Sequence, residues 1–348
     1  MEEKVLKAAT VFLGCLTIVV CVSLSYFPEL HARSVAAKEN VEQVHEESMG
    51  IQMKEIQEPE EELSAQLKIE LPAQVTEEEL QYENDYLNQI IYIRFPYGVS
   101  DYFSEYRMSG TCEHIAGLSY YMKDDMGVFE IHMDKVYELS TDFSEGELCV
   151  DFLETHQVYD KVVVVDAGHG SRAAGAVKQG AYEKNIDLAV ALQLKKVFEE
   201  HPEENIGVYY TRLDDSNPTL DQRSKLANNA DADLFISIHN NSSSSGKMSS
   251  LNGTQVLYSS VDHSEHTSKR FAQICLDNLC AALDSRSVGL MNGDDIYIIR
   301  TSNAPVALIE VGFMTNAKEL ELLQDEEYQY RAAQGIYSSI TQAFEEGY

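Results

Sequence analysis

The sequence predicts an α/β domain with a mostly parallel sheet flanked by helices, preceded by a small β-rich domain and an N-terminal transmembrane helix. From Lys161 onward, runs of Val, Ile and Leu alternate with helical patterns, which is typical of a sheet covered on both faces. Upstream, shorter runs alternate apolar and polar residues between turn signals. Near the N-terminus, one long stretch carries no charge. These changes of pattern divide the chain into 1–28, 29–66, 67–159 and 160–348.

Length and composition agree with this organisation. The 348 residues suit about two globular domains. With 58 acidic and 26 basic residues, the formal net charge is −32, and such a surface repels nucleic-acid phosphates. We therefore expect no nucleic acid as a partner. The six cysteines form no C-x-x-C pair and no finger spacing, so nothing supports a thiolate zinc site. Cys112 and Cys149 are expected to be either free thiols or, outside the cell, a disulfide.

The uncharged stretch runs from Ala8 to Pro28 and follows Lys4 and Lys7. A helix of this length reaches across a hydrocarbon core of ~30 Å, and the lysines favour a cytoplasmic N-terminus. We expect an uncleaved anchor, with the rest of the chain outside the cytoplasm at the cell membrane. A cleaved signal peptide with a site near Val35–Ala37 is the alternative, and would make the protein secreted. Residues 29–66, rich in acids and without an aromatic residue, predict a disordered tether.

Residues 67–159 predict a small β-rich domain, plausibly a sandwich. Alternating runs at 90–95, 128–133 and 147–152 are divided by turn residues, and tyrosines are frequent. His114 and His132 are isolated, and no group of residues here predicts catalysis. Binding to the cell wall or to a partner is a hypothesis from the position of this domain alone.

The last segment, 160–348, predicts strands and helices in alternation. The first strand, KVVVV, ends in Asp166-Ala-Gly-His-Gly, and the first helix has apolar residues on one face. The expected strands are 161–165, 205–212, 234–241, 253–259, 296–300 and 304–313. The expected helices are 185–200, 220–229 and 265–283, and a long helical region, 317–346, closes the chain.

Polar residues that can carry chemistry fall at the carboxyl ends of these strands, where open sheets form their sites. His169 follows the first strand, His239 ends LFISI, and Glu310 lies within the apolar run PVALIEVGF. Glu183 precedes the first helix. Two imidazoles and a carboxylate from separate loops hold zinc tetrahedrally with one position left for water. Burial in an apolar strand should raise the pKa of Glu310 and suit it to act as a general base.

Each of these residues also has an ordinary structural explanation when it is taken alone. Gly-His-Gly is often a turn, Ile-His-Asn is often a capped strand end, and a glutamate in an apolar strand often faces solvent. Asp166 is interpreted as a turn or supporting residue and Asp187 as a charge near a helix end. For Asn240 and Asn241, orienting substrate or water and capping a turn are equally good interpretations.

The combination of motifs, in this order, resembles the zinc-dependent N-acetylmuramoyl-L-alanine amidases, a cell-wall amidase family with an α/β catalytic domain. The resemblance covers Val162–Glu346, a little over half the chain. It rests on VVVVDAGHG (162–170), YEKNIDLA (182–189), TR (211–212), LDQRSKLANNADADLFISIHNN (220–241), IYIIR (296–300) and APVALIEVGFMTN (304–316).

The resemblance implies that His169, Glu183 and His239 bind Zn²⁺ and that Glu310 is the catalytic acid and base. It also implies that Arg300 binds or polarises the substrate. The substrate is then peptidoglycan, cleaved between N-acetylmuramic acid and the L-alanine of the stem peptide. Family members usually have a second Gly after Gly-His-Gly, where this chain has Ser171, which leaves the contacts of that loop with substrate less defined.

Some members of the family carry an inhibitory helix after the second histidine. Here the connection 242–252 is short, polar and rich in Ser, so we expect an open site that needs no protein activator. Two other functions remain as alternatives. A catalytically silent wall-binding or activator protein that kept the fold would be expected to lack a ligand or the acid, and all four residues are present. A zinc peptidase with another scissile bond has the same ligands and is disfavoured by the flanking motifs.

Overall fold

The computed structural model describes residues 65–111, 113–202, 205–261 and 267–348. The predicted anchor and nearly all of the predicted tether lie outside this range, as does Cys112. Among the described residues, no helix is long and apolar enough to cross a membrane. Cys149 is a free thiol in the structure.

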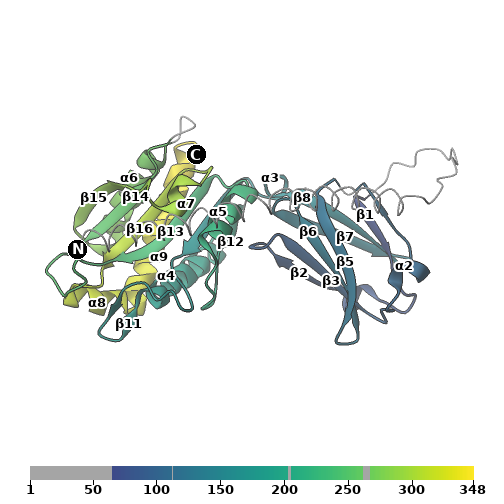
Figure 1. Ribbon diagram of the computed structural model, residues 1–348. Coiled ribbons are helices and arrows are strands. Elements are labelled where there is room, and N and C mark those ends of the chain that lie inside the picture. The colour runs from purple at the N-terminus through teal and green to yellow at the C-terminus, as the bar shows by residue number, and fades with distance from the viewer. Residues whose placement is uncertain (1–64, 112, 203–204, 262–266) are drawn as a thin grey trace, which may run out of the picture. The chain divides into compact units, whose positions relative to one another are not determined.

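Two four-stranded antiparallel sheets make up the N-terminal part of the described chain (Figure 1, purple and blue). One sheet has the order β4 (Met108–Gly110), β1 (Leu67–Glu70), β8 (Glu147–Glu154) and β7 (Tyr137–Ser144). The other has the order β2 (Gln81–Asp85), β3 (Ile90–Pro96), β6 (Met126–Met133) and β5 (Ile115–Lys123). Short helical turns lie at η1 (Glu77–Glu79), α2 (Tyr102–Glu105) and α3 (Thr155–Val158).

Alternation along the strands builds the shared core of these two sheets. In β3, Ile91, Ile93 and Phe95 are buried while the residues between them are partly exposed. Inward residues of β8 and of β1 belong to the same cluster. Tyr102 is buried against the rings of Phe95 and Phe129, with centroids 6.2 and 4.9 Å away. Packed aromatic rings of this kind contribute about 0.5–1.5 kcal/mol beyond the burial of their area.

The C-terminal part is an α/β domain, which confirms the predicted fold class. Its six-stranded sheet is mixed: four neighbouring strands are parallel, and two further strands, parallel to each other, run antiparallel to the fourth. The order is β12 (Ile206–Tyr210), β9 (Lys161–Ala167), β13 (Leu234–Asn241), β16 (Val306–Phe313), β14 (Thr254–Tyr258) and β15 (Ser287–Asn292). A small hairpin pairs β10 (Val177–Lys178) with β11 (Ala181–Tyr182).

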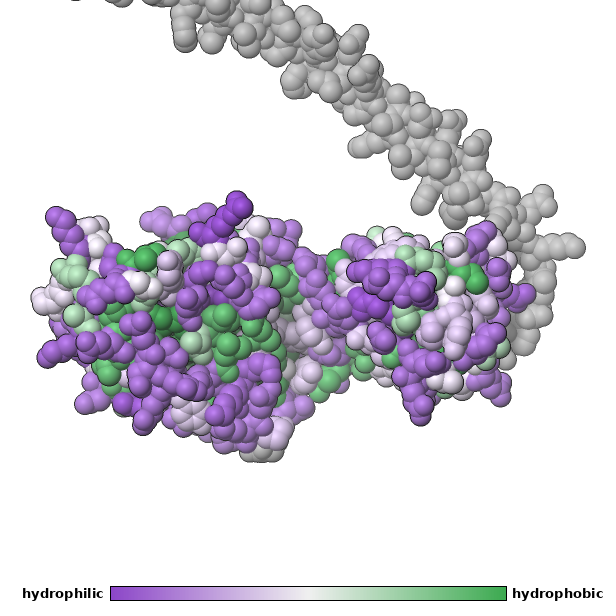
Figure 2. Space-filling model, turned by 90° about the horizontal axis from the view of Figure 1, so that it is seen from below, coloured by the Kyte–Doolittle hydropathy of each residue, from purple (hydrophilic) through white to green (hydrophobic). Residues whose placement is uncertain are grey.

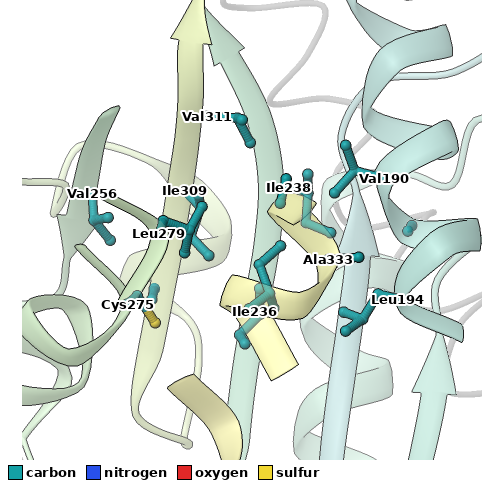
Figure 3. Packing of buried hydrophobic residues seen from close by; sticks show 14 of the residues in the cluster. Val190, Leu194, Ile236, Ile238, Val256, Cys275, Leu279, Ile309, Val311 and Ala333 are labelled. Atoms are coloured by element: carbon teal, nitrogen blue, oxygen red, sulfur yellow. The ribbon is translucent and has the colours of Figure 1, made fainter. Parts of the chain in front are cut away.

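Helices cover both faces of this sheet, which is why its strands read as continuous apolar runs. One apolar cluster joins Val163 and Val165 of β9 to α4 (Glu183–Glu199), α6 (Ser268–Leu283) and α9 (Glu326–Glu345). Figure 3 shows side chains of β13 and β16 between those of these helices. On the other face, Val162 and Val164 pack with α5 (Leu220–Asn229) and α7 (Tyr297–Arg300). Alternate residues of one strand therefore serve two cores.

The observed secondary structure differs from the predicted one, or adds detail to it, in three places. The predicted strand 296–300 is wrong: Tyr297–Arg300 is the short helix α7, in which the consecutive Ile298 and Ile299 are both buried. The strand β15 was not predicted, because at the sheet edge it is mostly exposed and lacks an apolar run. The predicted helical region 317–346 consists of two helices, α8 (Ala317–Leu323) and α9, since Asp325 caps the second by accepting from the Tyr328 N–H.

Candidate metal centre

The four residues that sequence reasoning singled out at strand ends and at the first helix lie together. His169 follows β9, and His239 and Glu310 are register partners in the neighbouring strands β13 and β16. Glu183 is the first residue of α4, which returns over the sheet from the loop that carries His169. Since β9, β13 and β16 are parallel neighbours, their carboxyl ends bring these side chains to one edge of the sheet.

The geometry of the two imidazoles and Glu183 fits a tetrahedral zinc ion. His169 Nε2 lies 3.0 Å and His239 Nδ1 3.2 Å from Glu183 Oε1, and the two rings are nearly perpendicular at 80°. Ligand atoms at 2.0–2.1 Å from a tetrahedral zinc ion are separated by about 3.3–3.4 Å. The two separations from Glu183 Oε1 are therefore close to those of a tetrahedral zinc site.

Asp187 is the second acid of this cluster, and the sequence had indicated it only as a charge near a helix end. One ligand atom each from His169, Glu183, Asp187 and His239 lies within 4.8 Å of the others. Asp187 is fully buried, and its Oδ1 accepts from the Asn240 amide at 2.8 Å. Its Oδ2 has no hydrogen-bond partner among the described residues. The spacing of four from Glu183, on a helix face with Ile186, was the signal that could have revealed it.

Electrostatics in the cluster favour a bound cation. Burial alone would lower the pKa of His239, but its hydrogen bond with Glu183 and the nearby Asp187 and Glu310 raise it to about 9. Burial would raise the pKa of Glu183, and the hydrogen bonds of His169 and His239 lower it well below its usual range. The pKa of Asp187 is raised well above its ordinary value by desolvation. Imidazole and carboxyl groups thus lie together in a buried cluster, which is a donor set suited to a divalent metal.

Glu310 is placed to exchange protons beside this cluster. Glu310 lines a cavity beside the cluster. Its Oε2 is buried without a hydrogen-bond partner among the residues that the structure describes. Desolvation raises the pKa of Glu310 to about 7, with His239 opposing that rise. A carboxyl group with a pKa near neutrality both accepts and returns a proton under ordinary conditions.

Two glycines let the ligands approach one another. A Cβ on Gly168 would stand 2.3 Å from Cε1 of the His239 ring. A Cβ on Gly175 would stand 2.4 Å from Glu183 Oε2, and its φ of +66° is in the left-handed region. His169 itself has φ 60°, an uncommon conformation for a residue with a side chain. Strain of this kind persists only where the surroundings hold it in place.

Two buried arginines hold the backbone of the His169 loop. Arg212 donates to the carbonyls of Ala167 and Gly168 at 2.9 and 2.6 Å, and Arg223 donates to those of Ala167 and His169. Arg223 also pairs with the fully buried Asp166. The interpretation of Asp166 as a supporting residue agrees with these contacts. The two arginines were visible only as members of motifs, because their contacts are with backbone carbonyls.

A cavity of about 620 Å³ opens beside the cluster. Its polar lining includes His169, Glu183, His239, Asn240 and Glu310, and its apolar lining includes Pro218, Leu220, Ile296, Ile298 and Leu308. Leu220, at the first position of α5, is 54% exposed. In Figure 2, green apolar surface on the α/β domain is surrounded by purple polar side chains. The cavity therefore presents titratable groups next to apolar side chains, as small-molecule sites generally do.

Arg300 does not line this cavity. It is the last residue of α7, is exposed, and donates to the backbone carbonyls of Asp294 and Asp295 at 3.4 and 3.2 Å. Its role in binding or polarising substrate stays a prediction. Asn241 bonds Gln255 and the Ser242 N–H, as a turn residue does, whereas Asn240 contacts Asp187 with its side chain and Glu183 with its N–H.

No helix lies in the connection 242–252, all of which is described. The connection is fastened to the segment after β16: Thr315 accepts from the Ser243 N–H through its hydroxyl and from the Ser249 N–H through its carbonyl, at 3.0 and 2.8 Å. No glutamate occurs in it. Within the described chain, nothing in this connection blocks the cluster.

Comparison with known proteins places this site in a family. A family model described as N-acetylmuramoyl-L-alanine amidase matches residues 163–342. The uncharacterized protein YqiI of Bacillus subtilis (strain 168) is 37% identical over 186 residues, covering 53% of this chain and 86% of that protein. The germination-specific N-acetylmuramoyl-L-alanine amidase of the same organism is 32% identical over 201 residues, covering 53% and 81%. The crystal structure of an N-acetylmuramoyl-L-alanine amidase from Clostridium difficile 630 aligns with a TM-score of 0.50 and 29% identity, covering 54% of this chain and 98% of that one.

Proposed function

Because this chain belongs to the N-acetylmuramoyl-L-alanine amidase family, we propose that it hydrolyses the amide between N-acetylmuramic acid and the L-alanine of the peptidoglycan stem peptide. The observation that carries this proposal is the convergence of His169, Glu183 and His239, with Glu310 beside His239 in the sheet register.

His169, Glu183 and His239 would hold a zinc ion, which supplies Lewis acidity toward the scissile carbonyl and the attacking water. Gly168 and Gly175 allow the close approach of the ligands, and Asn240 supports Glu183 through its N–H. Asp187 holds the Asn240 side chain by accepting a hydrogen bond from its amide. The chain's own residues thus set the position of the metal and its charge environment.

Glu310 moves the proton. Its carboxylate takes one proton from water as the water oxygen attacks the carbonyl carbon. It then gives that proton to the nitrogen of L-alanine as the carbon–nitrogen bond breaks. The pKa near 7 allows both halves of this exchange in one active site. The products are a muramic acid carboxylate and a stem peptide with a free amine.

The test is digestion of purified peptidoglycan by the full chain, with mass analysis of the products. The proposal expects intact stem peptides that begin with a free L-alanine amine, together with peptide-free glycan. Fragments cut within the stem peptide would instead support a zinc peptidase. Binding to peptidoglycan without any new end would support a catalytically silent wall-binding protein.

We further propose that residues 8–28 anchor the chain in the cell membrane and that the acidic tether lets the catalytic domain reach the wall. Cleavage of that segment would release the protein instead, and mass analysis of the N-terminus of the exported protein decides between the two. Activity without a protein activator is proposed from the open connection 242–252. Full chain that stays inert on purified wall until a cell extract is added would contradict it.

A further inference from the structure

Two lysines without a carboxylate partner in the described chain belong to segments whose earlier residues line the cavity. Lys178 belongs to β10 and Lys247 to the connection after β13. Ala176 and Ser242, which shortly precede them in the chain, line the cavity. Within the described residues, neither lysine makes an ion pair, whereas Lys184 near the same loop pairs with Asp215 at 2.7 Å.

The side chain of Lys178 lies near the turn that carries Lys247. The Lys178 ammonium lies 4.0 Å from the point where a Cβ on Gly246 would stand, and Gly246 directly precedes Lys247. Ser243 fastens the turn that carries Lys247 by donating its hydroxyl to the Lys247 carbonyl at 2.7 Å. The backbone that presents the second charge is therefore held in place.

These unpaired cations stand out against the charge of the protein. The formal net charge is −32, Glu183 and Glu310 line the cavity, and Asp187 lies in the same cluster as Glu183. An anionic substrate is repelled by most of this surface, so a local pair of positive charges decides where its anionic groups settle. Val177 and Met248, next to the two lysines, are each 43% exposed and offer apolar contact beside the charges.

We propose that Lys178 and Lys247 form a subsite that binds a carboxylate of the stem peptide. The inference rests on the proposed function. The amine end of the peptide is consumed in the scissile amide, so the free carboxylates of the peptide extend away from the reacting bond. Lysine suits this task because its compact ammonium on a flexible stem follows a carboxylate in several geometries. The subsite sets the peptide specificity of the reaction and leaves the proton transfer to Glu310.

The experiment compares kcat/KM of the full chain on two muramyl peptides that differ only in their stem carboxylates, free in one and converted to primary amides in the other. Wild-type protein is expected to prefer the free carboxylates by about tenfold, the effect of two half-exposed ion pairs. The preference should shrink as ionic strength rises, because exposed charges are screened by salt. Charge reversal in the double variant Lys178→Glu, Lys247→Glu should abolish or invert it.

Two control variants distinguish an effect of charge on substrate preference from a general loss of folding. Lys123→Glu, at the exposed turn between β5 and β6, makes a similar charge change far along the chain and should keep the preference. The double variant Lys178→Arg, Lys247→Arg retains both charges and should also keep it. Equal cleavage of both peptides by the wild type, or an equal loss on both in the charge-reversed variant, overturns the subsite while amidase activity stands. Cleavage of neither peptide overturns the proposed function and the subsite with it.

Discussion

Two buried groups of charged residues lie at the same edge of the α/β sheet, and their charges are balanced in opposite ways. Around Asp166, Arg223 supplies a counter-charge, and Thr211 and Ser237 each donate a hydroxyl at 2.6 Å. Burial would raise the pKa of Asp166, yet these partners hold it below its usual range. Around Glu183, by contrast, Asp187 and Glu310 each keep a buried oxygen without a partner in the described chain. The first group is paired within the protein, whereas the second keeps two carboxyl oxygens without a partner in the described chain.

This difference separates structural charge from functional charge. Buried carboxylates that are fully paired hold backbone, here the loop that presents His169. Buried carboxylates left unpaired destabilise the metal-free protein and are retained where a ligand supplies the missing charge. Substitutions in each of the two groups test this contrast. The expected effects decrease from loss of the metal to a modest change in zinc affinity.

The largest effect is expected for His169→Ala combined with His239→Ala. Removing both imidazoles leaves only carboxyl groups, which are a poor donor set for zinc. Metal content, measured by atomic emission on the purified full chain, should fall from about one zinc per chain to background. His156→Ala, an exposed histidine of α3, is the control. Zinc retained by the double variant would show that the ion binds elsewhere.

The next effect is expected for Glu310→Gln. Glutamine has nearly the same shape but cannot carry the proton, so kcat should fall about 10²- to 10⁴-fold while metal content and folding are retained. Glu321→Gln, on an exposed face of α8, should change none of these quantities. Loss of zinc in Glu310→Gln would make this residue a ligand instead, and turnover near the wild-type rate would remove it from the mechanism.

The residues of these two groups also show how much of the candidate site could be predicted from the sequence. The histidines and Glu310 were predictable because polar residues at the ends of apolar strands must meet at one edge of a sheet. Asp187 was not recognised, since its effect depends on which helix face is buried and on Asn240 from a distant strand. Arg300 was taken from a motif, and the assumption of a strand at 296–300 hid that this segment turns into α7. Contacts with backbone carbonyls, as for Arg212, leave no pattern in a single sequence.

Arg223→Met tests the paired group. Asp166 would be left as a buried charge without its counter-ion, which costs about 3–5 kcal/mol in the free energy of unfolding. Urea unfolding in the presence of a chelator measures this cost without a contribution from the metal. Lys225→Met on the same helix removes only an exposed pair with Asp221 and should change stability by less than about 0.5 kcal/mol. Equal effects of the two substitutions would contradict the structural role of the Asp166 pair.

Asp187→Asn is the smallest and most discriminating change, because it should act in opposite directions on the two states of the protein. The amide keeps an oxygen to accept from Asn240 but removes the buried charge, so zinc affinity should fall about 10- to 100-fold, as for other supporting residues of metal sites. In the metal-free protein, the same substitution removes an acid whose Oδ2 is unpartnered within the described chain, and the free energy of unfolding should stay equal or rise. Glu199→Gln, at the exposed end of α4, is the matched control for both measurements. The prediction is contradicted if the metal-free variant is less stable than the metal-free wild type, or if the variant binds zinc with wild-type affinity. In either case Asp187 would act as a paired structural carboxylate, as Asp166 does.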